Sequence, residues 1–174
     1  MEEVSPRRDQ LAVTGEDGGL GRSRRDIRRD LPSTVVFKPF GDELACTGKT
    51  HISIALGIRA CLAGQRVLFR TATEWVARLA DAQRQGKLDD ELARLERIPL
   101  LVCDEVGYIP FDPQAASLMF MLVSRRYERA SMIVTSNKPF SAWGEIFGDD
   151  MAATAMVDRL IHHAEILSTK GTQP

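Results

Sequence analysis

The amino-acid sequence predicts an α/β domain with a parallel sheet of about five strands and helices on both faces. Two observations lead to this prediction. From Thr34 onward, short apolar or β-branched runs alternate with longer segments of helical character. The run at residues 99–103 is apolar on both faces, as a central parallel strand must be. A sheet of this kind places ligands at the carboxyl ends of its strands.

The predicted strands are short segments rich in valine, isoleucine, leucine and phenylalanine, the residues that favour strands. We expect them at residues 34–37, 66–69, 99–103, 131–135 and 165–168.

The segments between these strands are predicted to be helices. Residues 48–63 carry apolar side chains on nearly every face, which indicates a buried helix, and Gly64 is expected to end it as a left-handed cap. Thr71 and Glu74 have the spacing of a capping box and open the next helix. Further helices are expected at 87–95, after Pro113, around 142–147 and at 151–163.

Composition excludes several classes of protein. The chain has 174 residues, of which 44% are apolar and 27% charged, as in one ordinary globular domain. A formal net charge of −1 gives no overall attraction to nucleic acid. Three cysteines without a C-x-x-C pair argue against a disulfide framework or a zinc site, and no apolar run is long enough for a membrane span. We therefore expect a cytoplasmic protein that does not enter a membrane.

Residues 1–33 differ from the rest of the chain, since glycines and mixed charges dominate without a sustained apolar period. We expect a disordered leader here and a folded domain at 34–174. Five arginines between Arg22 and Arg29 leave open the alternative that this segment is a basic arm for DNA phosphates.

A phosphate-binding motif is predicted at Gly48, Lys49 and Thr50, between a strand and a helix. The free backbone N–H groups of the helix start and the Lys49 ammonium suit phosphates, and the Thr50 hydroxyl suits Mg²⁺. A Gly-Lys-Thr tripeptide alone is common and is usually a plain helix start. Its position after a strand makes the functional interpretation stronger.

Asp104 and Glu105 follow an apolar strand, 55 residues after Lys49, which is the separation that two β-α units give. In a P-loop ATPase, Asp104 would hold the Mg²⁺ shell and Glu105 would act as the base for the attacking water. The alternative is a solvated strand terminus.

Two further polar residues follow in the order that a P-loop ATPase requires. Asn137 ends a strand and would place a neutral amide between the water and the γ-phosphate, although a simple turn is an equal alternative. Arg159 lies off the apolar stripe of its helix; it is either a solvated residue or an arginine finger for a neighbouring subunit's ATP. We expect all four motifs at the carboxyl ends of strands, or on a helix that faces that edge.

These segments together resemble the IstB-type helper ATPases of insertion-sequence transposition, which are kin of the DnaC-type helicase loaders in the AAA+ class. The likeness covers residues 47–171. The segments that carry it are Thr47–His51, Ala55–Ala60, Glu74–Leu79, Asp104–Pro110, Arg126–Ala130, Thr135–Phe140, Trp143–Glu145, Phe147–Asp149 and Asp158–Leu160.

The resemblance implies an AAA+-like P-loop NTPase that forms an ATP-bound homo-oligomer and acts on DNA and on the transposase of the same element. The ATP-binding residues that it implies are Thr47, Gly48, Lys49, Thr50 and His51. By the same likeness Thr50 and Asp104 hold Mg²⁺, whereas Glu105, Asn137 and Arg159 are catalytic. Helicase loading in DNA replication, as in the DnaC-type kin, is a further alternative.

The segment before Thr47 departs from the family pattern, because Glu43–Cys46 replaces a loop rich in glycine and proline. Cys46 stands where a glycine is usual, and a non-glycine residue at positive φ costs about 1–2 kcal/mol, or roughly tenfold in affinity. Glu43 adds repulsion toward a triphosphate. Neither the family's N-terminal DNA-binding domain nor a C-terminal lid is recognised. The alternative function is therefore a remnant that keeps the fold and acts as a non-hydrolysing interaction module.

Overall fold

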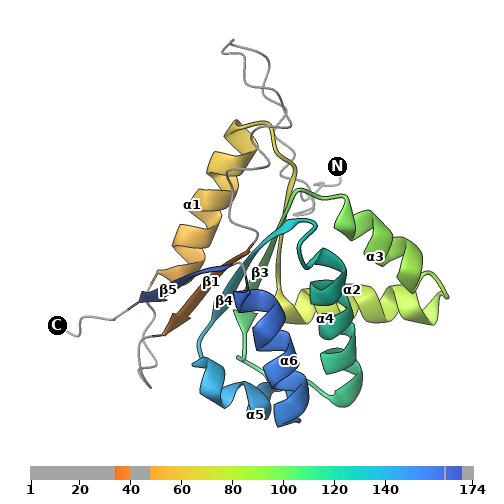
Figure 1. The fold of residues 1–174 in the computed structure, drawn as a ribbon. Helices are drawn as coiled ribbons and strands as arrows, with labels where there is room; N and C mark the ends of the chain where they lie inside the picture. Colours follow the sequence, from red (N-terminus) through yellow and green to blue (C-terminus); the bar gives the residue numbers. More distant parts are fainter. Residues whose placement is uncertain (1–33, 40–47, 163, 170–174) are drawn as a thin grey trace, which may run out of the picture.

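The computed structural model describes residues 34–39, 48–162 and 164–169, and its centre is one parallel sheet (Figure 1). The strands lie side by side in the order β2-β3-β4-β1-β5, and every neighbouring pair is parallel. Their bounds are β1 Thr34–Pro39, β2 Val67–Thr71, β3 Leu100–Val106, β4 Ser131–Ser136 and β5 Ala164–Thr169. This confirms the five predicted strands, and it places β3, β4 and β1 next to one another in the middle of the sheet.

Helices connect the strands as predicted, with ends that differ from the predicted ones by a few residues. Their bounds are α1 Lys49–Leu62, α2 Ala72–Arg84, α3 Leu88–Glu96, α4 Pro113–Arg126, α5 Trp143–Phe147 and α6 Asp150–Ile161, with a short 3₁₀ helix, η1, at Phe140–Ala142. The capping box of Thr71 and Glu74 is formed, and Gly64 has the left-handed conformation expected after α1. None of the helices in the described ranges has the length and apolar character needed to cross a membrane.

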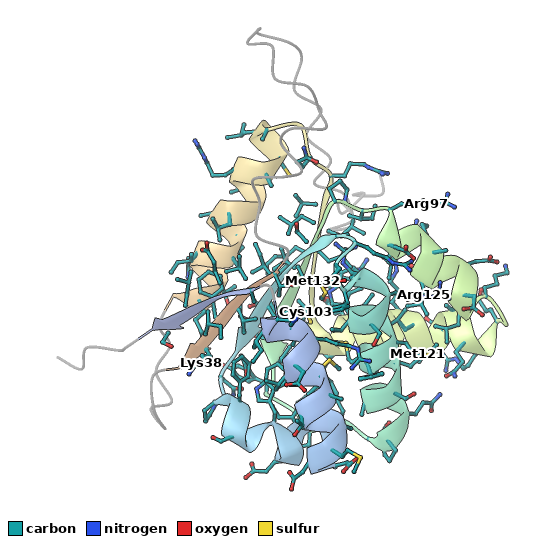
Figure 2. All side chains as sticks on the ribbon, viewed as in Figure 1. Lys38, Arg97, Cys103, Met121, Arg125 and Met132 are labelled. Atoms are coloured by element: carbon teal, nitrogen blue, oxygen red, sulfur yellow. The ribbon has the colours of Figure 1, made fainter. Side chains whose placement is uncertain are left out.

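Helices cover both faces of the sheet, and alternate strand residues face the two layers. Helix α1 packs on one face, where a small apolar cluster is formed by Phe37, Ala60, Leu100, Val102 and Ile133. The larger core lies on the other face, beneath α2, α4 and α6. Cys103 and Met132, labelled in Figure 2, belong to this larger core.

Helix α1 is less buried than its apolar content predicts. Its buried positions are the small residues Ser53, Gly57 and Ala60, which allow the helix to approach β2, β3 and β4 closely. By contrast, Ile58 is 55% exposed and Leu62 is 71% exposed. The prediction of a fully buried helix was therefore wrong. An apolar helix surface does not reveal how many of its faces will meet another element, and here one face meets the sheet.

Arg126, at the end of α4, joins three elements of the larger layer. Its side chain is 1% exposed, and its Nη1 donates hydrogen bonds to the carbonyl oxygens of Leu95 (2.6 Å) and Ile98 (3.0 Å). Its Nη2 donates to the carbonyl of Ser131 at 2.5 Å. Burial lowers the pKa of the Arg126 guanidinium to about 10, so the group stays charged at neutral pH. It links the end of α3 to the starts of β3 and β4.

Candidate functional site

The start of α1 provides backbone donors at the carboxyl edge of the sheet. Gly48 caps the helix in the left-handed conformation, with φ 67°, and no heavy atom lies within 4 Å of the position that a Cβ would take. Glycine is therefore favoured there by backbone conformation rather than by lack of space. The first turn of α1 contains no acidic residue, so its N–H groups and dipole remain suited to an anion. In Figure 1 this helix start and α5 lie at the end of the sheet to which the arrowheads of β1 and β3 point.

Asp104 meets the same helix start from the end of β3. Its carboxylate is 2% exposed, and Oδ1 accepts a hydrogen bond from Thr50 Oγ1 at 3.2 Å. A second hydroxyl, that of Thr135 on β4, donates to the same oxygen. Because a buried carboxylate is costly without partners, these two donors explain how Asp104 is accommodated. The fold thus brings together two residues that are 54 positions apart.

Glu105 follows Asp104 but points outward, since its side chain is exposed. Its φ is 63°, a left-handed conformation that costs a non-glycine residue on the order of 1–2 kcal/mol. Its backbone N–H donates to Thr135 Oγ1 at 3.0 Å. Strain of this kind concentrates at functional sites, and here it turns one carboxylate inward and the next one outward.

Asn137 lies against the turn that follows Glu105. A Cβ on Gly107, whose φ is 96°, would lie 3.0 Å from Asn137 Oδ1 and 2.7 Å from Cδ1 of Ile146. Asn137 Oδ1 is buried, and within the described part of the chain no group donates a hydrogen bond to it. The structure therefore brings Asn137 to the same edge as Asp104 and Glu105, with an amide oxygen that is not used internally.

Helix α5 closes one side of this edge through an aromatic cluster. The rings of Phe140, Trp143 and Phe147 pack in sequence, and Phe111 packs edge-on against Phe147 at 5.5 Å. Lys138, the residue after Asn137, forms an ion pair with Glu145 at 2.6 Å. The hydrogen bond from Lys138 lowers the pKa of the Glu145 carboxyl. These contacts anchor the segments on both sides of the β4 terminus.

Arg159 is not brought to this edge. It lies in the last turn of α6, which leads back to Ala164, and Ala164 pairs with Thr34 at the start of β1. Its guanidinium lies 4.5 Å from the ring centroid of Phe120 on α4, and its Nη1 donates to the Ala155 carbonyl at 3.0 Å. Arg159 therefore does not join the other three motifs at the carboxyl edge; it lies on a helix, as the expectation allowed, but at the end of α6 that is away from that edge, and its catalytic role stays a prediction. A helix that connects to the next parallel strand must end near the opposite edge.

Part of the predicted site lies outside the described residues. This holds for Thr47 and for the segment Glu43–Cys46, and it also holds for the leader at 1–33, so these predictions stay predictions. His51 is described and exposed on the first turn of α1.

Sequence reasoning missed Thr135. It is 2% exposed and contacts both Asp104 and Glu105. The available signal was a polar residue near the end of an otherwise apolar strand, two residues before Asn137.

Asp104 and Thr50 suit a Mg²⁺ ion that is held mainly by phosphate and water, rather than a metal ion enclosed by protein ligands alone. Within the described ranges, no group of three or more His, Cys, Asp or Glu side chains could hold a metal. Mg²⁺, however, is commonly held by one or two carboxylates together with phosphate oxygens and water. One buried carboxylate beside one hydroxyl, at a helix start that suits phosphate, matches that requirement.

Comparison with known proteins agrees with this arrangement. The model of one protein family, described as IstB-like ATP binding protein, matches residues 43–173. The chain belongs to the IstB-like family. The match includes the start of α1, the ends of β3 and β4, and all of α6.

Curated relatives of this IstB-like chain come from insertion sequences. It is 49% identical over 124 residues to the insertion sequence IS21 ATP-binding protein of Pseudomonas aeruginosa. The aligned segment covers 71% of this chain and 47% of that protein. It is 45% identical over 124 residues to the IS5376 protein of Geobacillus stearothermophilus, covering 71% and 49%. The chain thus spans about half the length of these relatives.

Solved structures show the same fold at low identity. The DnaC helicase loader superposes with a TM-score of 0.65 at 19% identity, covering 84% of this chain and 85% of that one. The replication initiator DnaA bound to AMPPCP and single-stranded DNA gives a TM-score of 0.66 at 16% identity, covering 85% and 44%. The fold is therefore that of an AAA+-like P-loop NTPase.

Proposed function

We propose that this IstB-like chain binds ATP with Mg²⁺ at the carboxyl edge of its sheet and hydrolyses it as a helper in DNA transposition. The observation that carries the proposal is the hydrogen bond between Thr50 and Asp104 at the start of α1. It places a hydroxyl and a buried carboxylate beside the phosphate-binding end of a helix, as a magnesium-nucleotide site requires.

Each residue at the edge has a distinct role in this proposal. Lys49 and the N–H groups after Gly48 hold the phosphates, and Thr50 and Asp104 hold Mg²⁺. MgATP, when bound, supplies the γ-phosphoryl group that water attacks. Glu105, exposed next to Asp104, accepts the proton of that water, and the Asn137 amide orients it.

Arg159 supports the proposal of an ATP-bound homo-oligomer. Within one chain it lies toward the opposite edge of the sheet from Asp104. An arginine finger at this position would therefore reach the nucleotide of a neighbouring copy rather than its own. The names of the relatives, which assign them to insertion sequences, support the setting of transposition. The proposal adds DNA and the transposase of the same element as partners, in the cytoplasm.

Two alternatives are distinguished by experiment. In the first, the replacements Glu43 and Cys46 abolish nucleotide binding, and the chain is a remnant that serves as an interaction module. In the second, the chain loads a helicase in replication, an alternative that is supported by the DnaC fold alone.

Titration of the purified chain with a fluorescent ATP analogue and Mg²⁺ tests the proposal. We expect micromolar binding that falls about 10–100-fold in Lys49→Ala, since a hydrogen bond to a charged group contributes about 1.5–3 kcal/mol. Lys87→Ala, at an exposed position before α3, is the matched control and should bind as the unmodified chain does. If binding appears only in a Glu43→Gly/Cys46→Gly double variant, the remnant alternative is correct.

A further inference from the structure

Strand β3 contains one extra residue opposite β4 at the candidate site. Cys103 pairs with Val134, whereas Val106 pairs with Ser136, so β3 advances three residues while β4 advances two. This is a β-bulge, a feature that often re-aims side chains next to active sites. Thr135 is the β4 residue that lies opposite Asp104 and Glu105.

The Thr135 hydroxyl supplies the hydrogen-bond acceptor that the backbone of the bulge needs. A bulged residue is unpaired in the strand ladder, and here the Glu105 N–H donates to Thr135 Oγ1 at 3.0 Å. The same hydroxyl donates its own proton to Asp104 Oδ1. One buried hydroxyl therefore holds the backbone of Glu105 and the carboxylate of Asp104 at the same time.

The two donors on Asp104 are not equivalent. Thr50 belongs to the proposed metal site, where a lone pair of its hydroxyl oxygen would hold Mg²⁺ while its O–H donates to Asp104 Oδ1. Thr135 lies on the neighbouring strand and is 2% exposed, so its hydrogen bond to Asp104 can persist. Partners of this kind orient a metal ligand without touching the metal.

We propose that Thr135 is a positioning residue that holds Asp104 for Mg²⁺ and Glu105 for water through the β3 bulge. This inference rests on the proposed function and adds a residue to it. The Thr135 hydroxyl is required for the part of the ATP affinity that depends on Mg²⁺. The phosphates of the nucleotide are held at the start of α1.

Two readouts test the role of the hydroxyl in Thr135→Val, which keeps the shape and removes the oxygen. The first is the ratio of ATP affinity with Mg²⁺ to that with EDTA, which should fall about 10–100-fold because outer-shell partners typically have effects of that size. Affinity in EDTA should stay within about twofold. The second is hydrogen exchange at the Glu105 amide in the nucleotide-free protein, measured by NMR, which should accelerate at least about tenfold as the acceptor is lost.

Two further variants serve as controls. Thr135→Ser keeps the hydroxyl and should restore both readouts. Thr154→Val removes a hydroxyl that donates to Asp150 on α6, and it should change neither.

Specific results would overturn the proposal. The proposal is contradicted if Thr135→Val leaves two quantities unchanged: the ratio of ATP affinity with Mg²⁺ to that with EDTA, and the protection of the Glu105 amide from exchange. If that variant does not fold, Thr135→Ser decides: loss of the Mg²⁺ effect in the serine variant shows that the methyl group, and not the hydroxyl, matters. If the unmodified chain does not bind ATP, the proposed function fails, and the exchange of the Glu105 amide alone decides whether Thr135 holds the bulge.

Discussion

Replacing Glu105 with glutamine is expected to lower the rate of ATP hydrolysis by about 10²–10⁴-fold, the contribution typical of a general base. Glutamine has nearly the same shape and keeps the backbone N–H that donates to Thr135 Oγ1. The bulge and the buried Asp104 should therefore be preserved, and MgATP affinity should change by less than about threefold, well under 1.4 kcal/mol. Phosphate release at saturating MgATP, together with a nucleotide titration, measures both quantities.

Glu128→Gln is the matched control for this prediction. Glu128 is the other described non-glycine residue with positive φ, at 57°, and it lies beyond the end of α4 near the starts of the strands. The same change there should leave hydrolysis intact. A Glu105→Gln variant that hydrolyses at the unmodified rate would exclude Glu105 as the base, and one that loses binding would assign it to the binding site instead.

Replacing Arg126 with methionine is expected to lower the free energy of unfolding by about 3 kcal/mol or more. The change leaves three backbone carbonyls without their charged donor in a site that is 1% exposed, and each unsatisfied buried group costs about 1–3 kcal/mol. Lysine should not rescue the loss, because a single ammonium lacks the planar fork that reaches Leu95, Ile98 and Ser131 together. Denaturant unfolding followed by circular dichroism gives the comparison.

The neighbouring arginine provides the control for stability. Arg125 pairs with Asp89 at 2.8 Å, but the side chains are 41% and 86% exposed, respectively. Exposed ion pairs contribute about 0–1 kcal/mol, so Arg125→Met should cost less than about 1 kcal/mol. Equal losses in the two variants would show that Arg126 is not the residue that links α3 to the sheet.

Sequence patterns were sufficient for the strands and for the motifs that lie directly at strand ends. Asp104 and Glu105 follow a short apolar run, and such a run between two helical segments is typical of an inner strand of a parallel sheet. The exposure of α1 was missed because an apolar helix surface does not say how many layers will cover it. The position of Arg159 required the path of the chain from α6 into β5.

Thr135 was missed for a different reason. Its role depends on a bulge in β3, and a bulge is a property of the pairing of two strands rather than of either one. The sequence of β4 alone shows a threonine in a strand, which is an ordinary occurrence.

The most direct test of the nucleotide site is an NMR titration of the ¹⁵N-labelled chain with Mg²⁺ and a non-hydrolysable ATP analogue. We expect the largest shift changes at the start of α1 and at the ends of β3 and β4, and we expect Lys49→Ala to need about 10–100-fold more analogue to reach them. The amides concerned are those of Gly48, Lys49, Thr50, Asp104, Glu105 and Asn137. An unchanged spectrum at millimolar analogue would show that this edge of the sheet does not bind nucleotide. Changes centred instead on the surface pocket at the end of α4 would place nucleotide binding elsewhere. That pocket is lined by Phe120, Met121, Ser124, Arg125 and Arg129, of which Figure 2 labels Met121 and Arg125.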